Sequence, residues 1–300
     1  MKSIYNYYKM IPALLLSVFL VSNSMPVTAQ DTTATVAPKP KPVKSTFEST
    51  WLIDNQSVMV PVKGTLQMDI MHRFGTVNNG YKDFYGIYAP SNIRIGMSYA
   101  PIDKLNVGFG FTKAHMTWDI NAKYALIKQT NTGGWPVSVT YFGNVAIDTR
   151  AAENFVNNTD RLSYFNQIII ARKVTDNFSV QVAPSLSHYN AVEGYLNEEG
   201  VLVGKMSHDH IAVSVGARYK ITQGTVIMVN YDQPITKHTT NNPMPNISLG
   251  VEFNTSAHAF QLFLSNYQYI VPQMNNMYNQ NDYRDGQFLI GFNITRLWNF

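Results

Sequence analysis

The chain has 300 residues, of which 13% are aromatic and only 14% are charged, and it contains no cysteine. The lack of cysteine excludes disulfide bonds and a cysteine-linked lipid, so the fold depends on packing and backbone pairing. Two of the 23 Lys and Arg residues lie in a predicted leader, which leaves 21 against 19 Asp and Glu. This near balance argues against a nucleic-acid partner.

The first 29 residues are typical of a secretory signal peptide. Lys2 and Lys9 form a basic start, an apolar run covers 10–21, and the small residues of 27–29 suit a cleavage site. The apolar run is too short for a membrane-spanning helix, which needs roughly 20 residues. We therefore expect export and exclude 1–29 from the fold.

Residues 30–63 are predicted to comprise a periplasmic linker rich in Pro and Lys, 30–47, and a short N-terminal segment, 48–63. Pro38, Pro40 and Pro42 alternate with lysines and favour an extended chain without a core. Residues 48–63 contain two apolar clusters, and both a short plug inside the fold and a collar beneath it fit them.

From residue 64 onward, apolar and polar residues alternate with period two, which predicts strands with one apolar and one polar face. The predicted strands cover 66–70, 93–99, 105–111, 118–124, 136–148, 161–173, 177–189, 210–221, 225–232, 246–254, 258–266 and 288–300. Residues 168–170 and 225–229 are apolar at successive positions, so the sequence leaves their facing open.

The links between these runs alternate in length, with tight turns such as 222–224 and long links such as 191–207. An even number of strands with short turns at one end and long loops at the other is the arrangement of an outer-membrane barrel. Only the link around Ala114 departs from the rule. We predict an all-β fold, a closed antiparallel transmembrane barrel of about 12 strands over 64–300, in outer-membrane lipid, with the N-terminus periplasmic.

The polar faces of the predicted strands carry many charges, which suit a wet or salt-bridged lumen better than a dry core. The lumen candidates are Asp69, Arg73, Arg94, Asp119, Lys123, Arg218, Lys220 and Glu252.

The run His72-Arg73-Phe74-Gly75 and the stretches SLSH from Ser185 and SLGVEF from Ser248 carry a family likeness. Over about residues 46–300 the chain resembles a family of Gram-negative outer-membrane β-barrel proteins of unknown function. The resemblance implies a barrel with a periplasmic N-terminus, and it implies no catalytic residue. For Arg73 we expect an ion pair across the lumen to a carboxylate such as Asp119 or Glu252, or else a charged constriction that selects solutes.

His188, His208 and His210 flank one long link and are weak candidates for a metal site. The alternation of side chains along a strand argues against one shared metal site. His188 lies on the apolar face of its strand, whereas His208 and His210 lie on the polar face of theirs. Ser185 and Ser187 also face away from His188, and the sequence has no G-x-S-x-G motif or phosphate loop. We expect no cofactor and no enzymatic activity, with a lipid hydrolase as the exception to keep in view.

The last predicted strand ends on Phe300, and counting back by twos from it gives Trp298 and an apolar face broken only by Arg296. We expect Trp298 and Phe300 to form a signal for the barrel-assembly machinery. The leading function hypothesis is a narrow channel for a small solute. The alternative is a non-conducting surface protein whose loops bind a partner or glycan.

Overall fold

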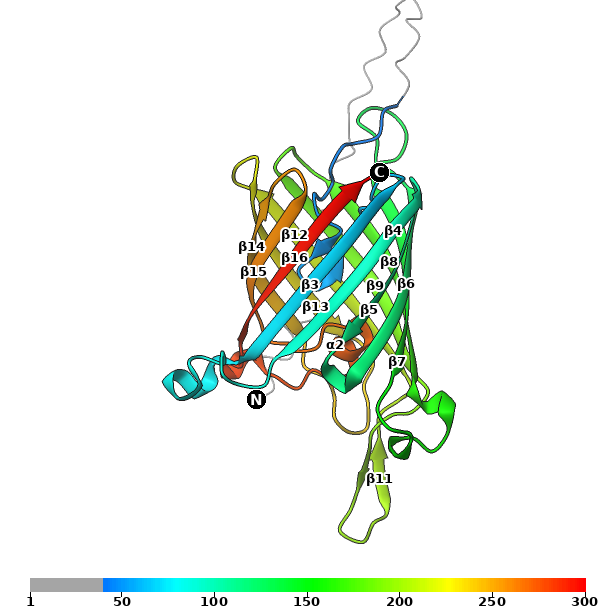
Figure 1. Ribbon diagram of the computed structural model, residues 1–300. Helices are drawn as coiled ribbons and strands as arrows, with labels where there is room; N and C mark the ends of the chain where they lie inside the picture. Colours follow the sequence, from blue (N-terminus) through cyan, green and yellow to red (C-terminus); the bar gives the residue numbers. More distant parts are fainter. Residues whose placement is uncertain (1–39) are drawn as a thin grey trace, which may run out of the picture. The chain divides into compact units, whose positions relative to one another are not determined.

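The computed structural model describes residues 40–300, and the predicted signal peptide and the start of the linker lie outside the described residues. The described chain forms a closed barrel of antiparallel strands (Figure 1). This confirms the predicted fold class and the number of strands. Within residues 40–300, no helix is long and apolar enough to cross a membrane.

Every run predicted from the sequence is a strand of the barrel wall. The wall strands are β3 (Thr65–Thr76), β4 (Asn92–Ile102), β5 (Leu105–Thr112), β6 (Thr117–Ile127), β7 (Ser138–Asp148), β8 (Leu162–Lys173), β9 (Phe178–Tyr189), β12 (Asp209–Lys220), β13 (Thr225–Pro234), β14 (Asn246–Asn254), β15 (His258–Ser265) and β16 (Leu289–Asn299). Wall strands that follow one another pair in antiparallel, and β16 pairs with β3 from Asn299↔Thr65 to Leu289↔Thr76. Closure leaves no unpaired edge, which a sheet in hydrocarbon requires.

Side chains alternate between the two faces of each wall strand. In β3, Gln67 and Asp69 are buried inside the barrel, whereas Leu66 and Ile70 lie on the outer face. The outer face keeps large apolar side chains exposed, among them Phe109, Ile120, Leu249, Leu262 and Leu264. An apolar outer surface around a polar interior is the pattern of a barrel that faces lipid.

Short links join the strands at one end, here called the short-turn end, and long links join them at the other, the long-loop end. Figure 1 shows the C-terminus at the short-turn end. The long links contain structure that the sequence did not predict: the β10–β11 hairpin (Gly194–Leu196, Leu202–Lys205), α2 (Pro272–Tyr278), and short helical turns η2 (Val77–Asp83), η3 (Ala114–Met116), η4 (Ala152–Asn154), η5 (Asn158–Arg161) and η6 (Tyr283–Asp285).

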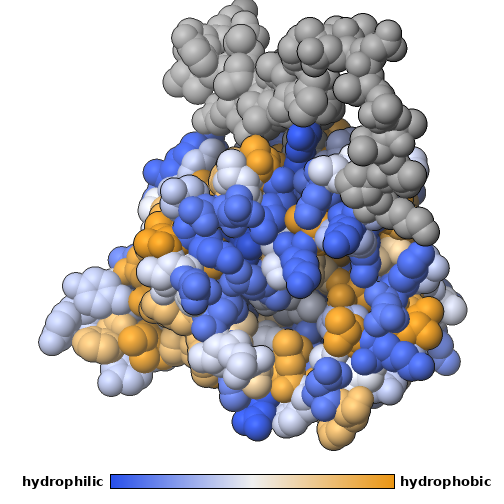
Figure 2. Space-filling view, turned by 90° about the horizontal axis from the view of Figure 1, so that it is seen from above, coloured by the Kyte–Doolittle hydropathy of each residue, from blue (hydrophilic) through white to orange (hydrophobic). Residues whose placement is uncertain are grey.

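Two segments fill the interior of the barrel. Residues 46–58, here called the plug, carry the small hairpin β1 (Trp51–Leu52) and β2 (Asn55–Gln56) and are buried except for the half-buried Glu48. Residues 267–279, here called the cap, include α2 and lie in the β15–β16 link. Figure 1 shows the plug in blue inside the wall. Figure 2 looks onto the short-turn end and shows hydrophilic residues gathered in the middle of that end. Of the two placements that the sequence left open for this segment, the structure has the plug.

Candidate functional site

The lumen candidates all lie on wall strands with their side chains turned inward. All are at most 4% exposed except Lys220, which lies at the short-turn mouth with 24% of its side chain exposed. The charges do not line an empty pore, because most of them bond to one another, to the plug or to neighbouring amides.

Arg94 and Asp119 form a bidentate pair across strands β4 to β6. The Arg94 Nε and Nη2 atoms each donate to a carboxylate oxygen of Asp119 at 2.8 Å. Gly96 and Gly110 make room for the guanidinium, since a Cβ on either would lie within 2.5 Å of Arg94 atoms. Bidentate arginine–carboxylate pairs are the strong, geometrically specific kind.

Arg73 does not pair with Asp119 or Glu252, as the sequence suggested. Its Nη2 lies 3.6 Å from Oδ1 of Asp54 in the plug, and its Nη1 donates to Asn293 at 2.9 Å. The prediction named the wrong partner because it considered only carboxylates of the wall, and the plug brings its own carboxylate into the lumen.

The other members of the His72–Gly75 run have structural roles that follow from the alternation. His72 faces outward and its ring stacks on Phe292 with centroids 5.2 Å apart. Gly75 faces inward where a Cβ would lie 2.4 Å from Ala89. In this run Arg73 therefore points into the lumen. On one side of it His72 packs on Phe292 at the outer face, and on the other Gly75 lets the chain at Ala89 come close to β3.

The wall holds the plug largely through the plug's backbone carbonyl groups. Lys123 is the clearest case: its Nζ donates to Thr50 O at 3.2 Å, to Gln56 Oε1 at 2.7 Å and to Ser57 O at 3.3 Å. Four further wall side chains donate to backbone carbonyl oxygens of the plug. They are Gln261 to Trp51, Asn293 to Ile53, Gln181 to Gln56 and Thr140 to Val58. A wall that satisfies the backbone of an irregular segment inside the barrel is built to receive that segment.

One side of the plug makes apolar contacts. Leu52, Ile53 and Val58 belong to one buried cluster with inward-facing wall residues, namely Phe142, Phe165, Ile169, Val226, Met228 and Phe263. This cluster explains why 168–170 and 225–229 are apolar at successive positions: Ile168 and Ile227 face outward, and Ile169 and Met228 face the plug. Apolar residues on the inward parity were the available sequence signal for the plug.

At its mouth and its tip the plug makes charged contacts. Glu48 Oε1 lies 2.7 Å from Lys220 Nζ and 3.5 Å from Arg218 Nη1 at the short-turn mouth. At the tip, Asp54 Oδ2 accepts from Asn275 Nδ2 of the cap at 2.5 Å. The plug and the cap therefore meet inside the barrel.

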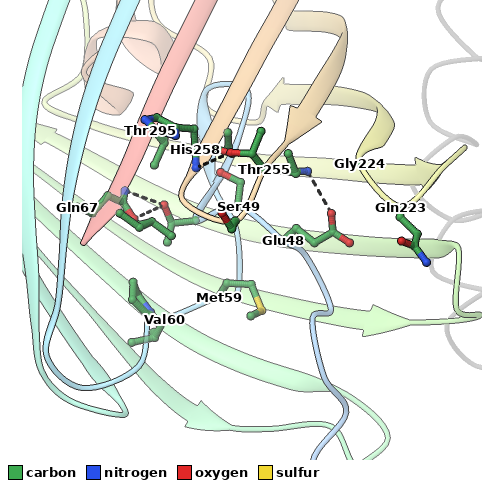
Figure 3. Close-up of a pocket in the computed structure, with 16 residues that line it drawn as sticks. Glu48, Ser49, Met59, Val60, Gln67, Gln223, Gly224, Thr255, His258 and Thr295 are labelled. Carbon is green, nitrogen blue, oxygen red and sulfur yellow. Dashed lines mark hydrogen bonds between the residues drawn. The ribbon is translucent and has the colours of Figure 1, made fainter. Parts of the chain in front are cut away.

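A cavity of about 490 Å³ lies at the short-turn end between the wall and both arms of the chain that enters and leaves the plug. Figure 3 shows Glu48 and Ser49 from the entering arm, Met59 and Val60 from the returning arm, and Thr295 from the wall. The inner boundary includes Gln67, whose Nε2 donates to Thr50 Oγ1 at 2.8 Å. This cavity is a vestibule that the plug separates from the long-loop end.

The three candidate histidines do not form one site, although the rings of His188 and His208 stack with centroids 6.2 Å apart. His188 faces outward and bonds Asp209 at 2.7 Å, and His208 bonds the backbone oxygen of Tyr189 at 2.7 Å. His210 is buried and its Nδ1 lies 2.9 Å from Nε2 of His238. Burial lowers the pKa of His238 in the β13–β14 link. Within residues 40–300 no three His, Cys, Asp or Glu side chains group as metal ligands would.

The serines near His188 do not form a catalytic pair with it. Ser185 and Ser187 are buried on the inner face of β9, whereas the imidazole of His188 lies on the outer face and is 40% exposed. A nucleophile and its base must lie within hydrogen-bond reach, which the pleat prevents here.

At the C-terminus, Trp298 and Phe300 lie on the outer parity of the last strand. The Arg296 guanidinium lies 4.9 Å from the centroid of the Trp298 ring, and the Phe300 side chain is 86% exposed at the short-turn end. The Phe300 N–H donates to Gly64 O at 3.3 Å, next to the start of β3.

Residues 47–298 match the family described as "Membrane bound beta barrel domain (DUF5777)". The match covers most of the chain, and the chain belongs to this family. No curated protein matches the sequence. The family and the barrel together confirm the resemblance inferred from the sequence.

Solved structures with a similar fold are outer-membrane barrels. An outer-membrane channel from Pseudomonas putida F1 is 11% identical, with 80% of this chain and 97% of that chain covered and a TM-score of 0.50. The NanC porin is 8% identical, with 78% of this chain and 99% of that chain covered and a TM-score of 0.48. The KdgM porin is 10% identical, with 78% of this chain and 99% of that chain covered and a TM-score of 0.44. At these identities the likeness concerns the fold alone, and the protein is an outer-membrane type of β-barrel.

Proposed function

We propose that this protein is a gated outer-membrane channel for a small polar solute, with the plug as its gate and the described conformation as its closed state. The long-loop end faces the exterior and the short-turn end faces the periplasm, so that both ends of the described chain are periplasmic. This orientation is the usual one for barrels with short turns at one end and long loops at the other.

The observation that carries the proposal is the path of the plug. The chain enters past Glu48, turns at Ile53 and Asp54, and returns past Pro61 to β3, and both Glu48 and Pro61 border the same vestibule. A segment that enters and leaves through one mouth can withdraw without breaking any pair of wall strands. Opening of the gate therefore requires no change in the pairing of the wall strands.

The wall also supports an open state. When the plug leaves, water can satisfy the charged and amide side chains that held it, such as Lys123, Gln181 and Gln261. The apolar wall residues that pack on the other side of the plug become exposed to the lumen, which favours the closed state. Side chains of both signs, with Arg94 and Arg218 against Asp69 and Glu252, favour a small polar solute over a strongly charged one. A 12-stranded barrel lies between filled barrels of about eight strands and porins of 16 or more.

A second candidate is a non-conducting barrel whose loops bind a partner. The observation in its favour is the dense bonding of plug and cap, in which Asn275 of the cap holds Asp54 of the plug. One experiment separates the two functions.

The experiment measures planar-bilayer conductance of the full chain and of a variant in which residues 46–58 are replaced by a Gly/Ser segment of equal length. We expect brief, rare openings for the first and sustained conductance for the second. The matched control replaces a long-loop segment, 190–202, in the same way and should behave as the full chain does. A sealed barrel in the plug-replaced variant, with normal heat-modifiable mobility in gels, would reject the channel and favour the second candidate.

We further propose that Trp298 and Phe300 guide assembly by the barrel-assembly machinery. The exposed Phe300 ring and its backbone bond to Gly64 place the end of the last strand at the seam where the barrel closes. Deletion of Phe300, or a polar tail after it, is expected to lower the outer-membrane yield of heat-modifiable protein. Normal yields from both variants would contradict this role.

A further inference from the structure

A separate cavity of about 210 Å³ opens at the long-loop end, at the opposite end of the barrel from the vestibule. Its sides come from η3, from the β7–β8 link and from the start of the β9–β12 link, and Met274 and Tyr278 of α2 also line it. Segments far apart in the sequence thus converge on one concave site. Such convergence is the usual form of a small-molecule site.

The charges in this cavity are mixed, and only some are used within the protein. Arg150 forms a bidentate pair with Asp148, in which Nη2 lies 2.7 Å from Oδ2. Within residues 40–300, Arg161 and Glu193, one of each sign, lie in no ion pair of the fold. Burial and the nearby Arg150 lower the pKa of His115, which keeps its ring neutral near pH 7. The site therefore offers both donors and acceptors without a dominant sign.

Aromatic side chains lie among these polar groups. The Arg161 guanidinium lies over Phe155, 4.6 Å from the centroid of its ring, while Nη1 donates to the Asp148 backbone oxygen at 3.0 Å. Tyr189 and Tyr278 meet edge to face with centroids 5.2 Å apart. Aromatic rings offer flat apolar surface next to polar tips, and a fixed guanidinium presents its remaining N–H groups to an occupant.

We propose that this cavity binds one sugar ring, either as a free monosaccharide or as the terminal unit of a surface glycan. A sugar ring has C–H faces that pack on aromatic rings and hydroxyl groups that both donate and accept. The cavity volume of about 210 Å³ gives room for a single sugar ring, and because the cavity opens to solvent, further units of a glycan would lie outside it. Glu193 Oε2 accepts from Asn241 Nδ2 at 3.1 Å, and Arg161 uses Nη1 within the protein. A purely apolar ligand would displace water from the remaining polar atoms of these two side chains without replacing its hydrogen bonds.

The proposal is independent of the gated-channel function, because binding is measured whether or not the barrel conducts. The partly exposed site and the neutral ligand lead us to expect a dissociation constant of about 1 mM. The test is saturation-transfer NMR on the full chain in detergent micelles, with glucose, galactose, mannose and N-acetylglucosamine as probes, each also as its methyl glycoside.

We expect transfer to the ring protons of at least one sugar and at least a fivefold loss of that transfer in Arg161→Gln. The matched control is Arg284→Gln, an arginine in the β15–β16 link that does not line the cavity, which should leave the signal unchanged. Equal signals from the methyl glycosides would identify the terminal unit of a glycan, and signals from the free sugars alone would identify a soluble monosaccharide. Absence of transfer to every probe, or transfer that Arg161→Gln does not reduce, would overturn the proposal.

Discussion

Substitution of Gly216 by alanine is expected to loosen the plug while leaving the barrel wall intact. Gly216 lies on the inner face of β12, and an added Cβ would lie 2.2 Å from Leu52 Cδ2, 3.3 Å from Asn230 Oδ1 and 3.4 Å from Gln181 Cγ. Carbon atoms pack best at about 3.5–4.0 Å, so Leu52 would have to retreat by about 1.5 Å. Leu52 is only 1% exposed inside a packed cluster, so its side chain has little space to retreat into, and we expect part of the strain to shift the plug.

The size of the effect follows from the cost of overpacking a core, which is about 1–3 kcal/mol. Because the clash joins the wall to the plug, the cost falls on the closed state and not on the pairing of wall strands. At about 1.4 kcal/mol per tenfold change, the ratio of open to closed protein should rise by about 5- to 150-fold.

The assay is the frequency of open steps in a planar bilayer, supported by a labelling measurement. The chain has no cysteine, so Ser57→Cys, at a plug position that is fully buried, introduces a single thiol. Its rate of reaction with a bulky hydrophilic maleimide reports how often the plug leaves. Gly204→Ala is the matched control, because the nearest atom to its added Cβ lies at 3.5 Å, an ordinary contact.

A double variant makes the reasoning refutable. Leu52→Ala alone leaves a cavity and should also raise opening, at a cost of about 2–5 kcal/mol. In the double variant the Cβ of Gly216→Ala occupies space that Leu52→Ala vacates, so opening should rise by less than the two single effects combined. Unchanged opening and labelling in Gly216→Ala, or simple additivity in the double variant, would show that the contact between β12 and the plug does not control the gate.

Further predictions concern the charges of the lumen and the long links. Asp54→Asn leaves the buried Arg73 without its carboxylate and should cost about 3–5 kcal/mol, seen as a lower temperature for loss of heat-modifiable mobility; adding Arg73→Gln should restore part of it. The lowered pKa of His238 means that folding favours its neutral ring. Its contribution to the stability of the fold is therefore complete above the unfolded-state pKa of about 6.5. That contribution is lost as the pH falls from this value towards the lower pKa of the folded state. Proteolysis of the β9–β12 link should therefore be faster at about pH 5 than at about pH 7, and His238→Gln should remove the difference. In the opened channel, Arg94→Gln with Arg218→Gln should shift reversal potentials towards cation selectivity, whereas unchanged selectivity with lowered stability would mean that these arginines serve packing alone.

The sequence predicted the wall well, because a barrel in lipid imposes a strict alternation on every strand. Asp69 and Arg94 were placed inside from parity alone, and both side chains are buried there. Parity says which face a residue occupies and does not say what lies opposite it. For this reason Arg73 was assigned a wall carboxylate, when its partner is Asp54, from the segment 48–63 whose placement the sequence left open.

The plug and the cap were harder to predict, because neither repeats a pattern. The plug has no regular structure beyond a two-residue pairing, Trp51↔Gln56 and Leu52↔Asn55, and wall side chains satisfy much of its backbone. Ile169 and Met228 carried the usable signal: apolar side chains on the inward parity require an apolar occupant. The polar contacts of the cap gave no such signal, since asparagine and glutamine suit a solvated loop as well as a packed one.

The cap connects the two sites that the barrel contains. Met274 and Tyr278 line the outward-facing cavity, and Asn275 between them donates to Asp54 at the tip of the plug. An occupant that shifts α2 against β9 would therefore act on the hydrogen bond from Asn275 to the tip of the plug, while Ile270 of the cap lies in a separate apolar cluster with Trp51. A ligand changes a gating equilibrium only to the extent that it binds the two states differently, so coupling requires that the outer cavity change shape when the bond between Asn275 and Asp54 breaks. Under the two proposals made above, binding at the outer cavity and release of the plug are connected through one short helix, and the wall strands need not move.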